Sequence, residues 1–201
     1  ILQISTRPFD FWTTMCNEGE LLEKFNIQLS PIPMTELIEE IKAVKEEKTK
    51  LNEMLDVIHE TMEVQIKENE VENVAALAAA MKNLVEKYGC QAAAIQCWNA
   101  LQTEIGIMPC AANAILNEEG IPVVCETDIH GAVTALLVEA AGMGEVRSFF
   151  ADWTIRHPDL DNGELLQHCG PWPVSVAAEK PKLTYPLAFD HPGSLTAEAK
   201  H

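Results

Sequence analysis

Apolar residues recur along the first 150 positions in two patterns, as short buried runs and as longer stretches with one apolar face. The short runs predict strands and the one-faced stretches predict helices. We expect strands at 1–5, 26–29, 91–97, 121–125 and 146–151, and helices at 10–25, 35–49, 51–58, 71–88, 110–117 and 131–141. Strands that alternate with helices in this way favour an α/β fold, a doubly wound parallel sheet with helices on both faces.

The pattern changes after about residue 151, where prolines become frequent and helical periods become rare. We therefore expect a Rossmann-like α/β domain over residues 1–151. Residues 152–201 are expected to start a β-rich domain that is incomplete here. The chain opens on Ile1, inside an expected strand, so we interpret it as an excerpt from a longer protein.

Composition narrows the class of protein. The 201 residues include 14 basic and 31 acidic side chains, a formal charge of −17. A surface this acidic repels phosphates, which argues against nucleic acid and anionic membranes as partners. The sequence contains neither a membrane-spanning apolar run nor a signal segment. Its six cysteines form no C-x-x-C pair, which predicts reduced thiols in a cytoplasmic protein.

Candidate chemistry follows the expected strands, because ligands of such sheets gather at the carboxyl ends of the strands. Glu126 and Asp152 follow two of these strands, 26 residues apart (152 − 126), and His168 comes 16 residues later (168 − 152). Two carboxylates and an imidazole suit a hard divalent cation such as Mn²⁺ or Mg²⁺. Each carboxylate could instead cap a helix.

Four short segments resemble, in order and spacing, motifs of the L-fucose isomerase and L-arabinose isomerase family. They are Gln96-Cys97-Trp98 with Pro109-Cys110 downstream, Cys125-Glu126-Thr127-Asp128 before Gly131-Ala132, Asp152-Trp153-Thr154, and His168-Cys169-Gly170. The resemblance covers essentially the whole chain, as the second Rossmann-like domain of that family and the start of its β-rich C-terminal domain.

The resemblance implies an isomerase that interconverts an aldose and a ketose through an enediol, with Mn²⁺ or another divalent cation such as Mg²⁺ or Co²⁺. Glu126 and Asp152 would bind the cation and exchange the substrate proton, and His168 would lie at the cation. The family forms homo-oligomers, typically hexamers. Two departures argue against catalysis by these 201 residues alone. The N-terminal domain is absent, and His191 and His201 come too early to match the last metal-binding histidine of the family.

Three further residues are candidates for binding the sugar. Arg7 could hold a hydroxyl group or form a salt bridge. Gln96 lies at the end of the expected strand 91–97, and Trp98 could stack on a sugar ring or pack in the core. Other residues near these motifs are interpreted as structural. His130 would begin a helix, His157 would lie in a loop, and the thiols of Cys125 and Cys169 would pack in the core.

Two other functions compete with the isomerase. A non-catalytic relative would bind a sugar in the same crevice, and it would keep its ligand after metal chelation. An interaction scaffold would use the acidic helical region, about 34–88, and would leave the strand-end carboxylates unexplained.

Overall fold

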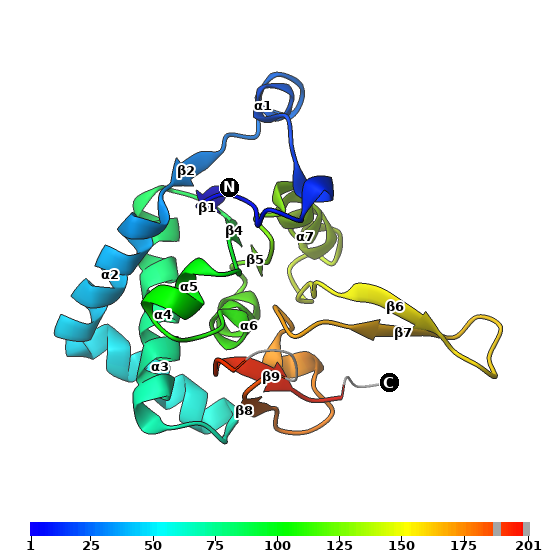
Figure 1. Cartoon of the computed structure of the whole chain (residues 1–201). Coiled ribbons are helices and arrows are strands. Elements are labelled where there is room, and N and C mark those ends of the chain that lie inside the picture. Colours follow the sequence, from blue (N-terminus) through cyan, green and yellow to red (C-terminus); the bar gives the residue numbers. More distant parts are fainter. Residues whose placement is uncertain (187–189, 199–201) are drawn as a thin grey trace.

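A four-stranded parallel sheet lies at the centre of the computed structural model, which describes residues 1–186 and 190–198 (Figure 1). His201 lies outside the described residues. The strand order is β2-β1-β4-β5, and β1 pairs with β2 on one side and with β4 on the other. The strands are β1 (Leu2–Ile4), β2 (Ser30–Ile32), β4 (Ala93–Ile95) and β5 (Val123–Val124). The predicted parallel sheet is confirmed.

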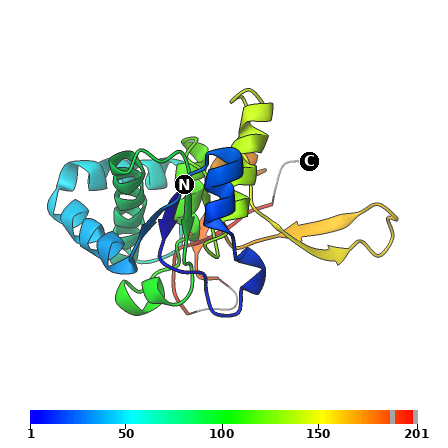
Figure 2. The same ribbon diagram turned by 90° about the horizontal axis from the view of Figure 1, so that it is seen from above.

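Helices lie on both sides of this sheet (Figure 2), as the pattern predicts. One side carries α2 (Met34–Glu46), α3 (Lys48–Thr61), α4 (Glu68–Lys87) and α6 (Cys110–Glu118). The other side carries α1 (Glu18–Phe25) and α7 (Ile129–Ala141). Three shorter helices connect these elements: η1 (Trp12–Thr14), α5 (Ala100–Glu104) and η2 (Val174–Val176). No helix in the described part of the chain is long and apolar enough to cross a membrane.

Alternation along the strands divides the apolar residues into two cores. Ile95 and Val123 face the core beneath α2, α3, α4 and α6, while Ala94 and Val124 face the smaller core beneath α1 and α7. Successive strand residues point to opposite faces of a sheet, so a strand covered on both sides is apolar throughout. This explains the unbroken apolar runs of the central strands.

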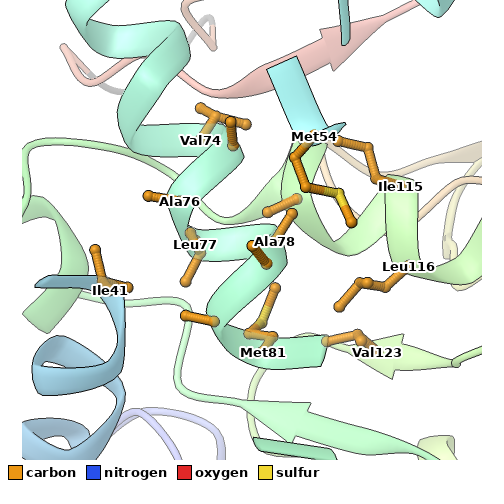
Figure 3. Packing of buried hydrophobic residues seen from close by; sticks show 14 of the residues in the cluster. Ile41, Met54, Val74, Ala76, Leu77, Ala78, Met81, Ile115, Leu116 and Val123 are labelled. Atoms are coloured by element: carbon orange, nitrogen blue, oxygen red, sulfur yellow. The ribbon is translucent and has the colours of Figure 1, made fainter. Parts of the chain in front are cut away.

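Helix α4 is the centre of the larger core (Figure 3). Eleven of its residues are buried, five of them alanines between positions 75 and 80. Small side chains let neighbouring helices approach closely, and α2, α3 and α6 all pack against α4. Leu77 and Met81 fill the remaining space and are fully buried. Burial of a side chain of this size contributes roughly 1.5–3 kcal/mol.

Two predicted elements near the N-terminus are shifted. The helix expected over 10–25 begins only at Glu18, because the Asn17 side chain caps it by accepting a hydrogen bond from the Glu20 amide, 3.1 Å away. The strand expected at 26–29 instead forms at Ser30–Ile32 and includes Pro31. Proline lacks a backbone donor, and β2 tolerates it because it is an edge strand.

The strand expected over 146–151 is wrong. The Glu139 carboxylate accepts hydrogen bonds from both the amide and the hydroxyl of Ser148, at 3.0 and 2.9 Å. These bonds hold the Ser148 backbone against the end of α7, so this amide is not available to a strand neighbour. Regular structure resumes only at Asp152, in a different sheet.

The C-terminal part forms two small sheets. β6 (Asp152–Arg156) and β7 (Glu164–Gln167) make an antiparallel hairpin that projects from the molecule and is exposed along its length (Figure 1). β8 (Lys182–Thr184) pairs with β9 (Ser194–Thr196) and with β3 (Glu63–Val64), which comes from the α/β region. Leu183 of β8 is buried in the larger core. The boundary near residue 151 stays a prediction, and strand pairing crosses it.

Candidate functional site

Three strands of the parallel sheet end at one edge, and side chains tie these ends together. The Ser5 hydroxyl, after β1, donates to Gln96 Oε1, after β4, over 2.9 Å. The Thr127 amide, after β5, donates to the carbonyl of Ile95 over 3.0 Å. The carboxyl ends of β1, β4 and β5 therefore form one connected platform, which is where ligands of such sheets bind.

The turn after β5 aims Glu126 into the protein. Glu126 and Thr127 both adopt left-handed backbone angles, with φ of 56° and 52°. Such angles cost non-glycine residues free energy, and they persist where the surroundings impose them. Here the Thr127 hydroxyl donates to the Thr6 carbonyl over 3.1 Å, and Asp128 Oδ1 caps α7 by accepting from the Gly131 amide over 2.9 Å. Glu126 is left only 9% exposed.

His168 presents a lone pair to this carboxylate. Its Nδ1 lies 3.1 Å from the Phe150 carbonyl, which can only accept a hydrogen bond, so Nδ1 carries the proton of the neutral ring. The other nitrogen, Nε2, lies 3.8 Å from Glu126 Oε1. Two electron-rich atoms facing each other favour a proton or a cation between them. The predicted convergence of Glu126 and His168 is seen in the structure.

Glu126 is poised for proton exchange. Burial raises the pKa of its carboxyl from the ordinary value of 4.5 to about 7, and the charge of Asp152 adds to that rise. The Cys97 thiol, with Sγ 3.6 Å from Oε1, opposes the rise by donating to the carboxylate. A carboxyl group with a pKa near 7 exchanges protons readily in both directions at neutral pH.

Asp152 occupies a different place from the one predicted. It does not end a parallel strand, because it is the first residue of the exposed hairpin, paired with Gln167. That pairing brings it to the base of the hairpin beside His168, within electrostatic reach of Glu126. The oxygen and nitrogen ligand atoms of Glu126, Asp152 and His168 do not form a set within 4.8 Å of one another among the described residues. Glu126 and His168 therefore form the centre of the site, with Asp152 at its margin.

The candidate sugar-binding residues lie around this edge with local partners. Arg7 packs its guanidinium over the Trp12 ring, 4.7 Å from the centroid, and donates to the Phe9 carbonyl over 3.0 Å. Among the described residues Arg7 forms no salt bridge, and its contact with a sugar stays a prediction. The half-buried Trp98 meets Phe11 edge to face at 5.5 Å. Gln96 accepts from Ser5, as described above.

Two cysteine thiols lie beside Glu126, while the packing role predicted for Cys125 and Cys169 stays a prediction. The Sγ atoms of Cys97 and Cys125 and a carboxylate oxygen of Glu126 all lie within 4.8 Å of one another. The thiol of Cys110 forms a hydrogen bond with that of Cys169, which holds the Cys169 pKa below that of an ordinary thiol. A signal was present in the sequence, because both expected strands 91–97 and 121–125 end in cysteine.

Two cavities flank α7, one of about 520 Å³ and one of about 610 Å³. His130 is exposed and lines both, and neither is lined by Glu126 or His168. His157, in the hairpin turn, accepts hydrogen bonds from the Asp159 and Leu160 amides at 3.0 and 3.1 Å, which is the structural role expected of it.

Sequence comparison links the chain to sugar isomerases. No family model matches it. It is 25% identical over 176 residues to a curated protein named sulfoquinovose isomerase from Alkalicoccus urumqiensis, a match that covers 88% of the chain. Proteins of the same name from Priestia megaterium and Clostridium sp. are 23% and 26% identical and cover 85% and 80% of the chain.

The chain spans well under half the length of these relatives, between 35% and 39%. Their names support the kind of protein that the motifs predict, a sugar isomerase. They do not name the L-fucose and L-arabinose isomerase family, so the sequence resemblance is supported only in its coarser form.

Proposed function

We propose that the chain is part of an isomerase that interconverts an aldose and a ketose, with the reaction centred on Glu126. The observation that carries the proposal is the buried Glu126 carboxyl group, whose pKa of about 7 and contact with His168 fit proton transfer. The similarity to proteins named sulfoquinovose isomerase supports the same reaction type.

Glu126 would act as the base. Its carboxylate takes the proton from C2 of the aldose and returns it to C1, while the hydroxyl proton moves from O2 to O1, so the ketose forms without gain or loss of atoms. Burial keeps water away from the carboxyl group, so the abstracted proton stays available for return. We assign the base to Glu126 rather than to Asp152 because Asp152 is exposed.

A divalent cation would fit beside this base. Glu126 Oε1 and His168 Nε2 lie 3.8 Å apart, close enough to share one ion with ligand distances of about 2.1 Å. Asp152 at the hairpin base would supply a further carboxylate oxygen. Mn²⁺, Mg²⁺ or Co²⁺ in that position would supply positive charge to the substrate oxygens as they become negative. Hydrogen bonding of Nδ1 to the Phe150 carbonyl orients the imidazole for this role.

The substrate would be a sugar small enough to reach the platform of strand ends. The names of the relatives put sulfoquinovose first among the sugars to test. The motif resemblance adds L-fucose and L-arabinose. Arg7 and Trp98 border the same platform and would contact the sugar after rearranging their local contacts.

The test measures ketose formation from these sugars by the intact protein with Mn²⁺ present. We expect Glu126→Gln to lower kcat at least 10³-fold, because the amide cannot accept the C2 proton. Glu104→Gln is the matched control, since Glu104 is exposed in α5. Chelation of the cation should stop turnover, and added Mn²⁺ should restore it.

Unchanged conversion in the Glu126→Gln protein would contradict the proposal. A protein that binds sugar equally well after chelation and converts none of the sugars would instead be a non-catalytic sugar-binding relative. Glucose-type and pentose-type aldoses in the same assay show how far the platform discriminates between sugars.

A further inference from the structure

A pair of buried thiols lies directly behind the proposed base. Cys97 follows β4 and Cys125 follows β5, and these neighbouring strands are paired in register. Both cysteines are 2% exposed. Their Sγ atoms and a Glu126 oxygen lie within 4.8 Å of one another, the one such set of ligand atoms among the residues that the structure describes.

This spacing is close to that of metal ligands. Two sulfur atoms bound to one Zn²⁺ at about 2.3 Å in tetrahedral geometry lie about 3.8 Å apart. Cys97 Sγ is already 3.6 Å from Glu126 Oε1, and His168 Nε2 is 3.8 Å from the same oxygen. Cys125 Sγ lies within 4.8 Å of both Cys97 Sγ and the Glu126 oxygen, so a shift of about 1 Å would bring these three atoms to ligand spacing. Two sulfurs and an oxygen are ligands that Zn²⁺ accepts, and His168 lies outside this set of mutually close ligand atoms.

Asn113 gives a second, independent indication. This α6 residue is completely buried, and its side-chain amide lies 3.6 Å from Cys125 Sγ, positioned to donate to the sulfur. Donors of this kind commonly support metal-bound sulfur atoms. The other end of the same amide, Oδ1, is buried without a hydrogen-bond partner in the described part of the chain. A buried polar group with one end unpaired is uncommon in a packed core.

Charge balance also permits a cation here. Two thiols and the Glu126 carboxylate carry a total charge of −1. When a divalent cation binds, each thiol gives up its proton, and two thiolates, one carboxylate and one cation again sum to −1. Binding therefore adds no net charge to the protein interior. A buried ion is costly when its charge is left uncompensated, and here it is compensated.

We infer that Cys97, Cys125 and Glu126 form a binding site for a thiophilic divalent cation of the Zn²⁺ type, distinct in ligand chemistry from the oxygen-rich site proposed above. The two sites share Glu126, so a cation held by the thiols competes with the cation of the oxygen-rich site for this carboxylate. Zn²⁺ then inhibits an enzyme that Mn²⁺ supports. The binding stands by itself, and only the inhibition rests on the proposed function.

The first experiment measures binding of Cd²⁺, a spectroscopic substitute for Zn²⁺, to the metal-free intact protein. We expect ultraviolet sulfur-to-metal charge-transfer absorption that saturates at one equivalent. Cys97→Ser and Cys125→Ser should each weaken Cd²⁺ binding at least about tenfold. Cys90→Ser is the matched control, because Cys90 precedes β4 at the opposite end of that strand. Charge-transfer absorption that survives unchanged in both variants overturns the inference.

A second measurement needs no variant and so does not depend on folding of the substituted proteins. X-ray absorption at the zinc edge of the wild-type protein should show two sulfur neighbours at about 2.3 Å. A coordination shell of nitrogen and oxygen alone contradicts the site.

The inhibition is measured separately. Zn²⁺ should suppress turnover in the presence of Mn²⁺, and Cys125→Ser should raise the Zn²⁺ concentration needed for half-inhibition at least tenfold relative to its own zinc-free rate. Absence of turnover with every sugar would refute the proposed function and leave the binding data to decide this inference. Turnover without Cd²⁺ or Zn²⁺ binding to the thiols would refute this inference alone.

Discussion

Glu126 combines three properties that rarely meet in one residue: a left-handed backbone, near-complete burial and two acidic neighbours in sequence or space. Each of them costs stability in the free protein. Strain and desolvation of this kind accumulate at functional sites, where the surrounding structure compensates for them. The cost is measurable, because the Glu126 pKa differs between the folded and unfolded states.

The raised pKa makes the metal-free protein less stable as pH rises. Between the unfolded value of 4.5 and the folded value of about 7, the folded protein holds a proton that the unfolded chain has lost. Stability therefore falls through this window. At pH 8 we expect Glu126→Gln to unfold with a free energy greater than that of wild type by roughly 2–3 kcal/mol.

Urea unfolding in a metal chelator, from pH 5 to pH 8, measures this difference. The free energy of unfolding of Glu126→Gln should exceed that of wild type by an amount that grows with pH. The difference between Glu104→Gln and wild type should stay constant. An advantage that is constant across the range would mean that the carboxyl group titrates normally in the folded protein.

At the same scale, the sequence predicted only in part which candidate residues lie together. Glu126 and His168 were identified from their motifs and lie together. The closeness of the Cys97 and Cys125 thiols was not predicted, because it depends on β4 and β5 being neighbours. Arg7 was placed correctly at a strand end, but its stacking on Trp12 depends on a connection whose shape no periodicity records.

Among the elements, α7 and the turn before it act as one unit. Asp128 caps α7 and also adds to the rise in the Glu126 pKa through its charge. The two effects separate by substitution. Asp128→Ala removes the cap and should lower the free energy of unfolding by about 1 kcal/mol.

Asp128→Asn is the informative partner, because asparagine caps a helix about as well as aspartate and carries no charge. We expect its stability to stay within a few tenths of a kcal/mol of wild type and the Glu126 pKa to move down. The pKa is followed by carboxyl nuclear magnetic resonance in metal-free protein. Equal destabilisation by both variants would show that the capping bond contributes little.

The elements were predictable where hydrophobic pattern alone decides them. β4, α4, α6 and α7 lie close to their expected ranges, because their apolar residues face cores on definite sides. The strand expected over 146–151 failed because one side chain, Glu139, binds the Ser148 backbone. The hairpin that begins at Asp152 and precedes His168 is exposed on both faces. Its strands therefore show no alternation of buried and exposed residues, and burial could not be used to predict them.

Across the whole molecule, burial is uneven. The larger core holds Leu77 at 0% exposure, whereas Leu137 on the outer side of α7 is 65% exposed. Exposed apolar side chains also gather on α1, the loop after α7 and the hairpin, on the side of the sheet opposite α2 and α4. The homo-oligomer expected from the sequence stays a prediction for which this surface is a natural interface.

The contrast between these two leucines can be measured. Leu77→Ala should cost 2–5 kcal/mol in the free energy of unfolding, since it leaves a cavity beside α4. Leu137→Ala should change the stability of the monomer by less than about 0.5 kcal/mol. Denaturant titration at low protein concentration gives both values. Comparable losses would indicate that Leu137 is covered in solution.

β8 pairs with β3, and Leu183 of β8 is buried in the larger core. These noncovalent contacts should hold the C-terminal part in place even when the chain is cut. The exposed hairpin turn, residues 157–163, is a natural cleavage point for a protease. Two fragments cut there should remain associated through β3 and β8 and co-elute on a sizing column. Leu183→Asp should let them separate. The backbone could then be supplied as two separately expressed pieces that reassemble, with Glu126 on one piece and His168 on the other.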